Sequence, residues 1–324
     1  MTRAAVPPPA ESDVPAAAAA GASPRAVPGT AWVLLICLTF AWGAMWPLMK
    51  LTLTEIPLLT FRAGSAACAG TIMLCVAAAT GLALRPAAGE ARKVILCAGV
   101  NVSLWFFLSA LAVTYLPAGR AALLAYTMPL WALVIGVMFL KERLTTRRCV
   151  GVAAGIGAVL VFAWDDLGAA GQAGFPVGIV AILLAALTWG VGSTLQKQFN
   201  FKTPVTTLVA WQFVLGSLPL MALALGSEDT GWVATVSAPV IAAAAGVTVI
   251  SQAFGLWCWS MILKLTDMAF ASIAVLTVPM MSQVLSFLFL GEPFGPVELA
   301  GLLLITFGLA TVLPLDQMVR RLKR

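Results

Sequence analysis

The chain has 324 residues, of which 61% are hydrophobic and 10% are charged, and its formal net charge is +6 at pH 7. A soluble domain carries about 25% charged residues, so this composition excludes an ordinary soluble protein and indicates a polytopic membrane protein. The chain contains no histidine. Because histidine is the commonest metal ligand and general base, we expect no metal and no cofactor.

The first segment, residues 1–29, is rich in alanine and proline, and we expect a disordered cytoplasmic tail there. Charged residues divide the rest into ten uncharged stretches, and a membrane-spanning helix needs about 20 mostly apolar residues. The predicted helices cover residues 31–50, 58–80, 94–115, 118–140, 148–164, 175–197, 205–226, 240–262, 268–290 and 296–315. Residues 316–324 form a short basic tail, which we also expect to be cytoplasmic.

The lysines and arginines are distributed unevenly between the two sides of this predicted bundle. With both termini in the cytoplasm, sixteen of the 19 lie on the cytoplasmic side, and only Lys50, Arg62 and Arg120 lie on the other. This bias is the positive-inside rule, and it indicates an integral protein of the cell (inner) membrane, with the lipid bilayer as its surroundings. We therefore attribute the basic excess to membrane topology and expect no nucleic-acid partner.

The second half of the chain partly repeats the first. Residues 121–151 align with residues 271–301 without a gap, which pairs Pro129 with Pro279 and Glu142 with Glu292. The repeats are predicted to be residues 30–165 and 174–315, with five helices each. Because five is odd, the second repeat enters the membrane upside down, as in many secondary transporters. The predicted fold is therefore an all-α polytopic membrane protein of ten transmembrane helices in two inverted five-helix repeats.

Three features carry a resemblance to a known family. They are the run W-G-x-x-W-P-x-x-K at residues 42–50, Arg62 in the second predicted helix, and the fourth-helix ending F-L-K-E-R-L, which returns as F-L-G-E-P-F. This ordered set resembles the EamA family of the drug/metabolite transporter superfamily, from residue 31 to about residue 315. The resemblance implies an inverted bundle of five plus five helices that moves small metabolites, in bacterial members usually outward. The second repeat departs from the pattern, with Gln212 opposite Arg62 and Pro293 after Glu292.

Polar and aromatic side chains near the middle of apolar helices are candidates for a substrate site. The candidates are Trp42, Trp46, Asn101, Trp105, Tyr126 and Trp189. Mid-span tryptophans do not fit the aromatic belt at the membrane surface, but core packing or lipid contact explains them equally well. For Asn101 the alternative is an interhelical hydrogen bond, because an unsatisfied amide in hydrocarbon is costly.

Two repeated features are candidates for gating. Pro129 and Pro279 are predicted at the centres of the fourth and ninth helices, where a proline kinks the helix; the kink acts either as a hinge or as a static bend. Lys50 and Glu292 end helices on the outer side, and Lys197 and Glu142 end helices on the inner side. We expect one lysine–glutamate contact at each mouth; the alternative is that each lysine complements its own helix dipole.

The function predicted from these features is secondary transport, as an exporter of small metabolites such as amino acids or amphipathic drugs, by alternating access. A flippase for a lipid-linked carrier has the same fold and is the first alternative, since Lys50, Arg62 and Arg120 could bind phosphate. A membrane-embedded lipid-modifying enzyme is an alternative of another class, but no cluster of acidic residues or metal ligands supports it. We expect no enzymatic activity, a small-molecule substrate and no obligate protein partner. No carboxylate lies well inside a predicted span, which argues against proton coupling through the midplane.

Overall fold

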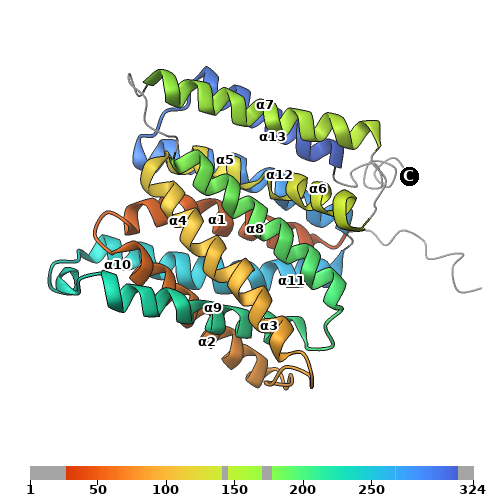
Figure 1. Ribbon diagram of the computed structural model, residues 1–324, viewed down its shortest axis with the longest axis vertical. Coiled ribbons are helices and arrows are strands. Elements are labelled where there is room, and N and C mark those ends of the chain that lie inside the picture. Colours follow the sequence, from red (N-terminus) through yellow and green to blue (C-terminus); the bar gives the residue numbers. More distant parts are fainter. Residues whose placement is uncertain (1–26, 141–144, 170–176, 267, 313–324) are drawn as a thin grey trace, which may run out of the picture.

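A computed structural model describes residues 27–140, 145–169, 177–266 and 268–312, and every regular element in these ranges is a helix (Figure 1). The helices of the first half are α1 (Gly29–Thr52), α2 (Leu58–Ala79), α3 (Ala91–Ala98), η2 (Gly99–Leu104), α4 (Trp105–Tyr115), α5 (Ala118–Ala125), α6 (Met128–Leu140) and α7 (Thr146–Ala169). Those of the second half are α8 (Val177–Phe199), α9 (Val205–Ser227), η3 (Gly231–Ala234), α10 (Ala238–Ala245), η4 (Gly246–Phe254), α11 (Gly255–Leu265), α12 (Met268–Leu290) and α13 (Pro296–Val312).

The chain is an all-α polytopic membrane protein, as its composition predicts. Within the described ranges, 8 helical segments are long and apolar enough to cross a membrane. Two further apolar segments, Val275–Leu290 and Pro296–Thr311, are shorter over the residues searched, so the count of ten helices stays a prediction.

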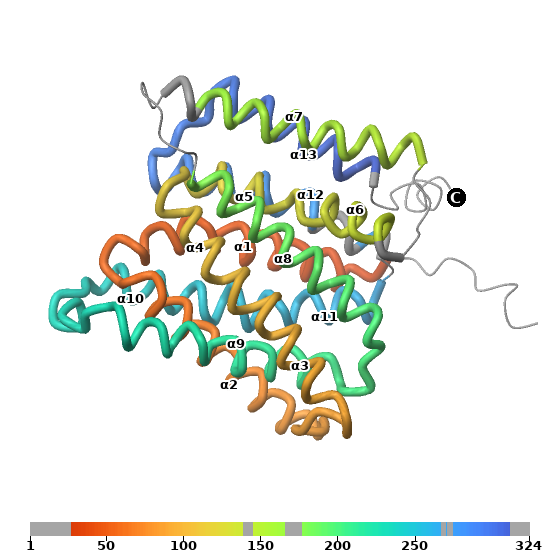
Figure 2. The backbone as a smooth tube through the Cα atoms, in the orientation of Figure 1, coloured from red at the N-terminus to blue at the C-terminus, as the bar shows by residue number. Residues whose placement is uncertain are grey.

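The two halves of the chain pack on each other with a reciprocal pattern (Figures 1 and 2). Helices α7 and α13 lie together at one edge of the molecule, and α2 and α9 lie together at the opposite edge. Between these edges, α1 packs on α12 and α11, while α8 packs on α6, α5 and α4. Each contact therefore has a counterpart in which the two halves exchange roles, which is the packing expected of a two-fold repeat.

Two glycines show this reciprocity at atomic detail. A Cβ on Gly43 of α1 would lie 2.7 Å from Cγ of Met281 in α12. A Cβ on Gly190 of α8 would lie 3.1 Å from Cβ of Trp131 in α6. Gly43 and Gly190 are the two glycines of the repeated Trp-Gly pair, and each lets its helix approach the same partner position of the other half.

A carboxylate from each half binds backbone amides at, or just before, a helix start of the other half. Glu228, after α9, accepts hydrogen bonds from the amides of Leu59 and Thr60 at the start of α2, both at 2.7 Å. Glu90, after α2, accepts hydrogen bonds from the amides of Lys202 and Thr203 before α9, at 2.7 and 3.2 Å. A carboxylate at a helix N-terminus satisfies free amides and complements the helix dipole. The cap made by Glu228 puts the end of α9 beside the start of α2, and Glu90 binds the loop before α9 from the segment that follows α2, so α2 and α9 run antiparallel.

We expected one continuous helix over residues 118–140, but the structure has two shorter helices there, α5 and α6. The predicted helix is broken at Tyr126 and Thr127, and Pro129 lies in the first turn of α6 rather than at a mid-helix kink. Proline has no N–H to donate and its ring clashes with the carbonyl four residues earlier, so the helix stops at Ala125 and restarts. Pro279, at the equivalent position, lies inside the continuous helix α12. The same residue therefore has two different structural outcomes in the two halves.

Candidate functional site

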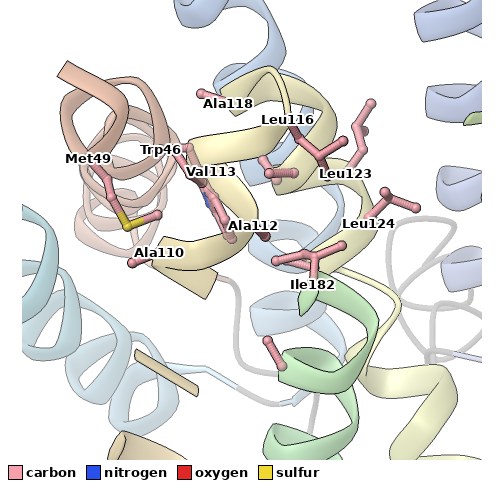
Figure 3. Packing of buried hydrophobic residues seen from close by; sticks show 14 of the residues in the cluster. Trp46, Met49, Ala110, Ala112, Val113, Leu116, Ala118, Leu123, Leu124 and Ile182 are labelled. Carbon is pink, nitrogen blue, oxygen red and sulfur yellow. The ribbon is translucent and has the colours of Figure 1, made fainter. Parts of the chain in front are cut away.

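Four of the six predicted substrate-binding residues meet in the largest apolar cluster of the bundle. Trp46 and Tyr126 are buried members of this cluster, with 1% and 6% of their surface exposed, and Trp42 and Trp105 pack against it. Figure 3 shows how Trp46 and Met49 of α1 lie against α4 and α5. Trp46 is thus surrounded by apolar side chains; whether it contacts a substrate stays a prediction.

Trp42 of α1, in the first half, contacts η4 and α11, which form the third span of the second half. Its indole Nε1 donates a hydrogen bond to the carbonyl of Ser251 at 3.1 Å, and its ring centroid lies 5.7 Å from that of Trp259. A Cβ on Gly255 would lie 2.4 Å from the same indole nitrogen, so Gly255 makes the room that Trp42 occupies.

Asn101 and Trp189 occupy the corresponding region of the other half. A Cβ on Gly192 of α8 would lie 1.6 Å from Oδ1 of Asn101, so the amide fits only against glycine. Both polar atoms of the Asn101 amide are buried and have no hydrogen-bond partner among the described residues. Trp189, one turn earlier on α8, is 36% exposed. The structure therefore places Asn101 beside α8 and leaves Trp189 partly outside the packed cluster.

Four of the buried, unpartnered polar atoms of the described residues lie in two π-helical segments at equivalent places in the two halves; others lie elsewhere, three of them in α12. Asn101 lies in η2 and Ser251 and Gln252 lie in η4. The hydroxyl of Ser251 and Oε1 of Gln252 are buried without a partner in the described part of the chain. Single π-helical turns inside α-helices often mark functional sites, because the extra residue loosens the backbone ladder. These two segments are the best-supported candidates for substrate contact.

Lys50 and Glu292 do not form the direct contact that we expected. Among the described residues, the Lys50 ammonium donates to the carbonyls of Val113 at 2.5 Å and Leu116 at 2.8 Å, at the end of α4. The Glu292 carboxylate accepts from the amides of Ala118 at 2.6 Å and Gly119 at 3.0 Å, at the start of α5. Lys50 and Glu292 therefore bind the same tight turn between α4 and α5. Lys50 binds carbonyls at the end of α4, where the helix dipole favours a cation, and Glu292 binds amides at the start of α5, where it favours an anion.

The contact between Lys197 and Glu142 that we expected at the inner mouth is not covered by the structure. Lys197 is exposed in the last turn of α8. Its predicted partner, Glu142, lies outside the described residues, so this contact stays a prediction.

Arg62 is a buried cation whose environment differs from those of Lys50 and Arg120. It lies in the second turn of α2 with 1% of its surface exposed, and its Nε donates to the carbonyl of Phe106 at 3.1 Å. The guanidinium carbon lies 3.9 Å from the centre of the Phe106 ring, within range of a cation–π interaction. Its Nη1 has no hydrogen-bond partner among the described residues.

Comparison with known proteins identifies the family. The profile of the EamA-like transporter family matches residues 29–164 and, a second time, residues 176–313. The chain belongs to this family.

Several relatives of this EamA-like transporter are similar over most of its length. It is 28% identical to the uncharacterized transporter YvbV of Bacillus subtilis, over 86% of this chain and 90% of the relative. It is 24% identical to a probable terminal-alkyne amino-acid exporter of Streptantibioticus cattleyicolor, over 83% and 88%. It is 27% identical to a probable amino-acid metabolite efflux pump of Salmonella typhimurium, over 60% and 67%. A solved crystal structure with 21% identity has the same fold, with a TM-score of 0.62 over 91% of this chain and 99% of the other.

The structure also contains an ion network that the sequence did not reveal. Arg120 at the start of α5 donates to Glu298 in the first turn of α13 at 2.5 Å and to Asp165 near the end of α7 at 2.9 Å. No local pattern links residues that lie 45 and 178 positions from Arg120, so only the folded chain brings them together.

Proposed function

We propose that this member of the EamA-like transporter family exports small metabolites across the cytoplasmic membrane by alternating access. The observation that carries the proposal is the reciprocal packing of the two halves, with buried, unpartnered polar atoms at the π-helical segment of each. Two similarly built halves can exchange contacts by rocking against each other around a shared site. The names of the amino-acid exporter and the efflux pump among its relatives support outward transport of amino-acid-like metabolites.

In this proposal the turn between α4 and α5 closes the outer mouth, and both termini are cytoplasmic. Lys50 and Glu292 hold that turn from opposite sides, and the break before Pro129 gives α6 freedom to move relative to α5. Pro279 has the corresponding place in α12. Of the three cations that a flippase could use to bind phosphate, Lys50 and Arg120 are already bound by groups of the protein, and only Arg62 is left for an external anion, so a phosphate site built from all three is not favoured.

The test is transport by purified protein in proteoliposomes. Labelled amino acids, sugars, organic acids and cationic drugs are offered one at a time, with and without a pH gradient, and empty liposomes are the control. We expect saturable transport of amino-acid-like compounds. Transport of none of the four classes would contradict the proposal, and movement of a labelled lipid-linked sugar between leaflets would favour the flippase.

A further inference from the structure

Three buried or half-buried cations lie in or near the predicted spans: Lys50, Arg62 and Arg120. In the described part of the chain, Arg62 is the one of these three that has neither a carboxylate partner nor two carbonyl partners. Lys50 binds two carbonyls, and Arg120 binds two carboxylates. Arg62 makes one hydrogen bond, to the carbonyl of Phe106, and no carboxylate of the described residues lies within the 4.0 Å of an ion pair. A buried charge without a counter-charge is costly in an apolar medium, so a permanently unpaired guanidinium would destabilise the bundle. The guanidinium of Arg62 is therefore suited to an anion that comes from outside the chain.

A hydrogen-bond acceptor lies on the same face of the bundle as this donor. Gln252 of η4 approaches the hydroxyl of Ser65 with its Nε2, at 3.5 Å, and its Oε1 has no partner. The Ser65 hydroxyl donates to the backbone carbonyl of Arg62 at 3.2 Å, and the two residues are three positions apart on α2, so Gln252 packs on the same face of α2 from which the Arg62 side chain extends. Gln252 is 5% exposed, so both groups are shielded from solvent in this conformation.

The two unpartnered atoms have complementary chemistry. Arg62 offers an N–H donor with a positive charge, and Gln252 offers a neutral carbonyl acceptor. A guanidinium binds a carboxylate in a planar, two-point geometry, and an amide carbonyl accepts a hydrogen bond from an ammonium or amine. We propose that Arg62 binds the carboxylate and Gln252 the neighbouring amino group of an amino-acid-like substrate. This inference rests on the proposed function and specifies the substrate class of that transporter.

The backbone around these residues allows the site to open. Gln252 is part of η4, and Phe106, which covers the guanidinium, follows η2 by two residues. A π-helical turn can relax to an α-helical turn with a small shift of the residues after it. Such a shift of η4 or α4 exposes Arg62 to one side of the membrane without unfolding a helix.

The second half has a neutral residue at the position that is equivalent to Arg62. Gln212 occupies the equivalent place in α9, is 3% exposed, and has an unpartnered Nε2. The fold thus accommodates a glutamine at this position of the repeat, which makes Arg62→Gln a suitable variant. The charge exists in one half only, so the proposed site is asymmetric.

The experiment measures ligand binding to purified protein in detergent through thermal shift and tryptophan fluorescence. The ligands are a neutral amino acid such as leucine, its carboxamide, its decarboxylated amine, its hydroxy acid and inorganic phosphate. The variants are Arg62→Gln, Arg62→Lys and Gln252→Leu, with Gln212→Leu as the matched control. Counterflow of labelled leucine in proteoliposomes is measured for the same set.

We expect the wild type to bind leucine roughly tenfold to hundredfold more tightly than leucinamide, since a hydrogen bond to a charged group contributes that much. Arg62→Gln removes this preference, Arg62→Lys keeps part of it because lysine lacks the two-point geometry, and Gln212→Leu keeps all of it. Gln252→Leu removes the preference for leucine over its hydroxy acid. The ratio of the affinities of two ligands for one variant does not depend on the fraction of folded protein, so a partly misfolded variant still gives a valid preference.

Other outcomes separate the inference from the proposed function. If the wild type binds and transports leucinamide or the amine as well as leucine, the carboxylate assignment is wrong and the exporter proposal stands. If phosphate competes with leucine in the wild type and not in Arg62→Gln while leucine and its hydroxy acid bind equally, Arg62 binds anions in general and the role of Gln252 is wrong. If the Arg62 variants keep the preference of the wild type, the site lies elsewhere. If no ligand is bound or transported, both the inference and the proposed function fail.

Discussion

Exchanging the charges of Lys50 and Glu292 distinguishes a direct ion pair from two separate helix-end contacts. In the structure each residue binds backbone groups of the α4–α5 turn, through two hydrogen bonds each. A hydrogen bond to a charged group contributes about 1.5–3 kcal/mol, so we expect Lys50→Met to lower the free energy of unfolding by about 2–4 kcal/mol. Glu292→Gln keeps one acceptor oxygen, and we expect a smaller loss of about 1–2 kcal/mol.

The double variant Lys50→Glu with Glu292→Lys puts a carboxylate against carbonyls and an ammonium against amides. Both charges then oppose the helix dipoles, so we expect the double variant to be less stable and less active than either single exchange. The assay is unfolding in detergent, followed by tryptophan fluorescence, together with counterflow in proteoliposomes. Glu228→Gln, which weakens the cap of α2 in the same way that Glu292→Gln weakens the cap of α5, is the control for a weakened cap away from this turn. Recovery of stability and transport in the double variant would refute this reasoning and support a direct ion pair.

Three further predictions concern packing, ion pairing and pH. Gly43→Ala should lower the free energy of unfolding by about 1–3 kcal/mol, because its Cβ would overlap α12, whereas Gly64→Ala, with nothing within 4 Å, should not; melting temperatures compare them. Glu298→Gln should destabilise by about 3 kcal/mol in denaturant titrations, because the buried Arg120 loses its main partner, and no change would mean that the pair is dispensable. Hydrogen bonds from Lys202 and Thr203 lower the pKa of Glu90 below its ordinary value of 4.5. Its contribution is therefore complete above that value and lost as pH falls through the lower folded pKa, so the acid-side decline in melting temperature should be weaker in Glu90→Gln.

The sequence predicted those parts of the fold that depend on hydrophobic length and on internal repetition. The boundaries of α1, α2 and α9 agree with the predicted spans to within a few residues, because charged residues limit each apolar stretch. The glycine contacts of Gly43 and Gly190 also follow the repeat alignment of the Trp-Gly pairs.

The details that depend on contacts between distant residues could not be predicted in this way. Nothing in composition shows that Pro129 would break a helix while Pro279 stays inside one, since the surrounding packing decides between a kink and a break. The cap made by Glu228 and the loop contact made by Glu90 join residues far apart in the chain, so these acids looked like ordinary loop residues. Arg62 was recognised as part of the family pattern, but its lack of an anionic partner became visible only in the folded chain.

We propose that two reciprocally packed halves expose one substrate site to the two sides of the membrane in turn. Counterflow in proteoliposomes tests this claim most directly: vesicles loaded with unlabelled leucine are diluted into a trace of labelled leucine without any ion gradient. An alternating-access carrier predicts a transient accumulation of label inside the loaded vesicles and none in empty ones, because internal substrate speeds the return of the site. Label that only equilibrates, at the same rate in loaded and empty vesicles, would contradict the account.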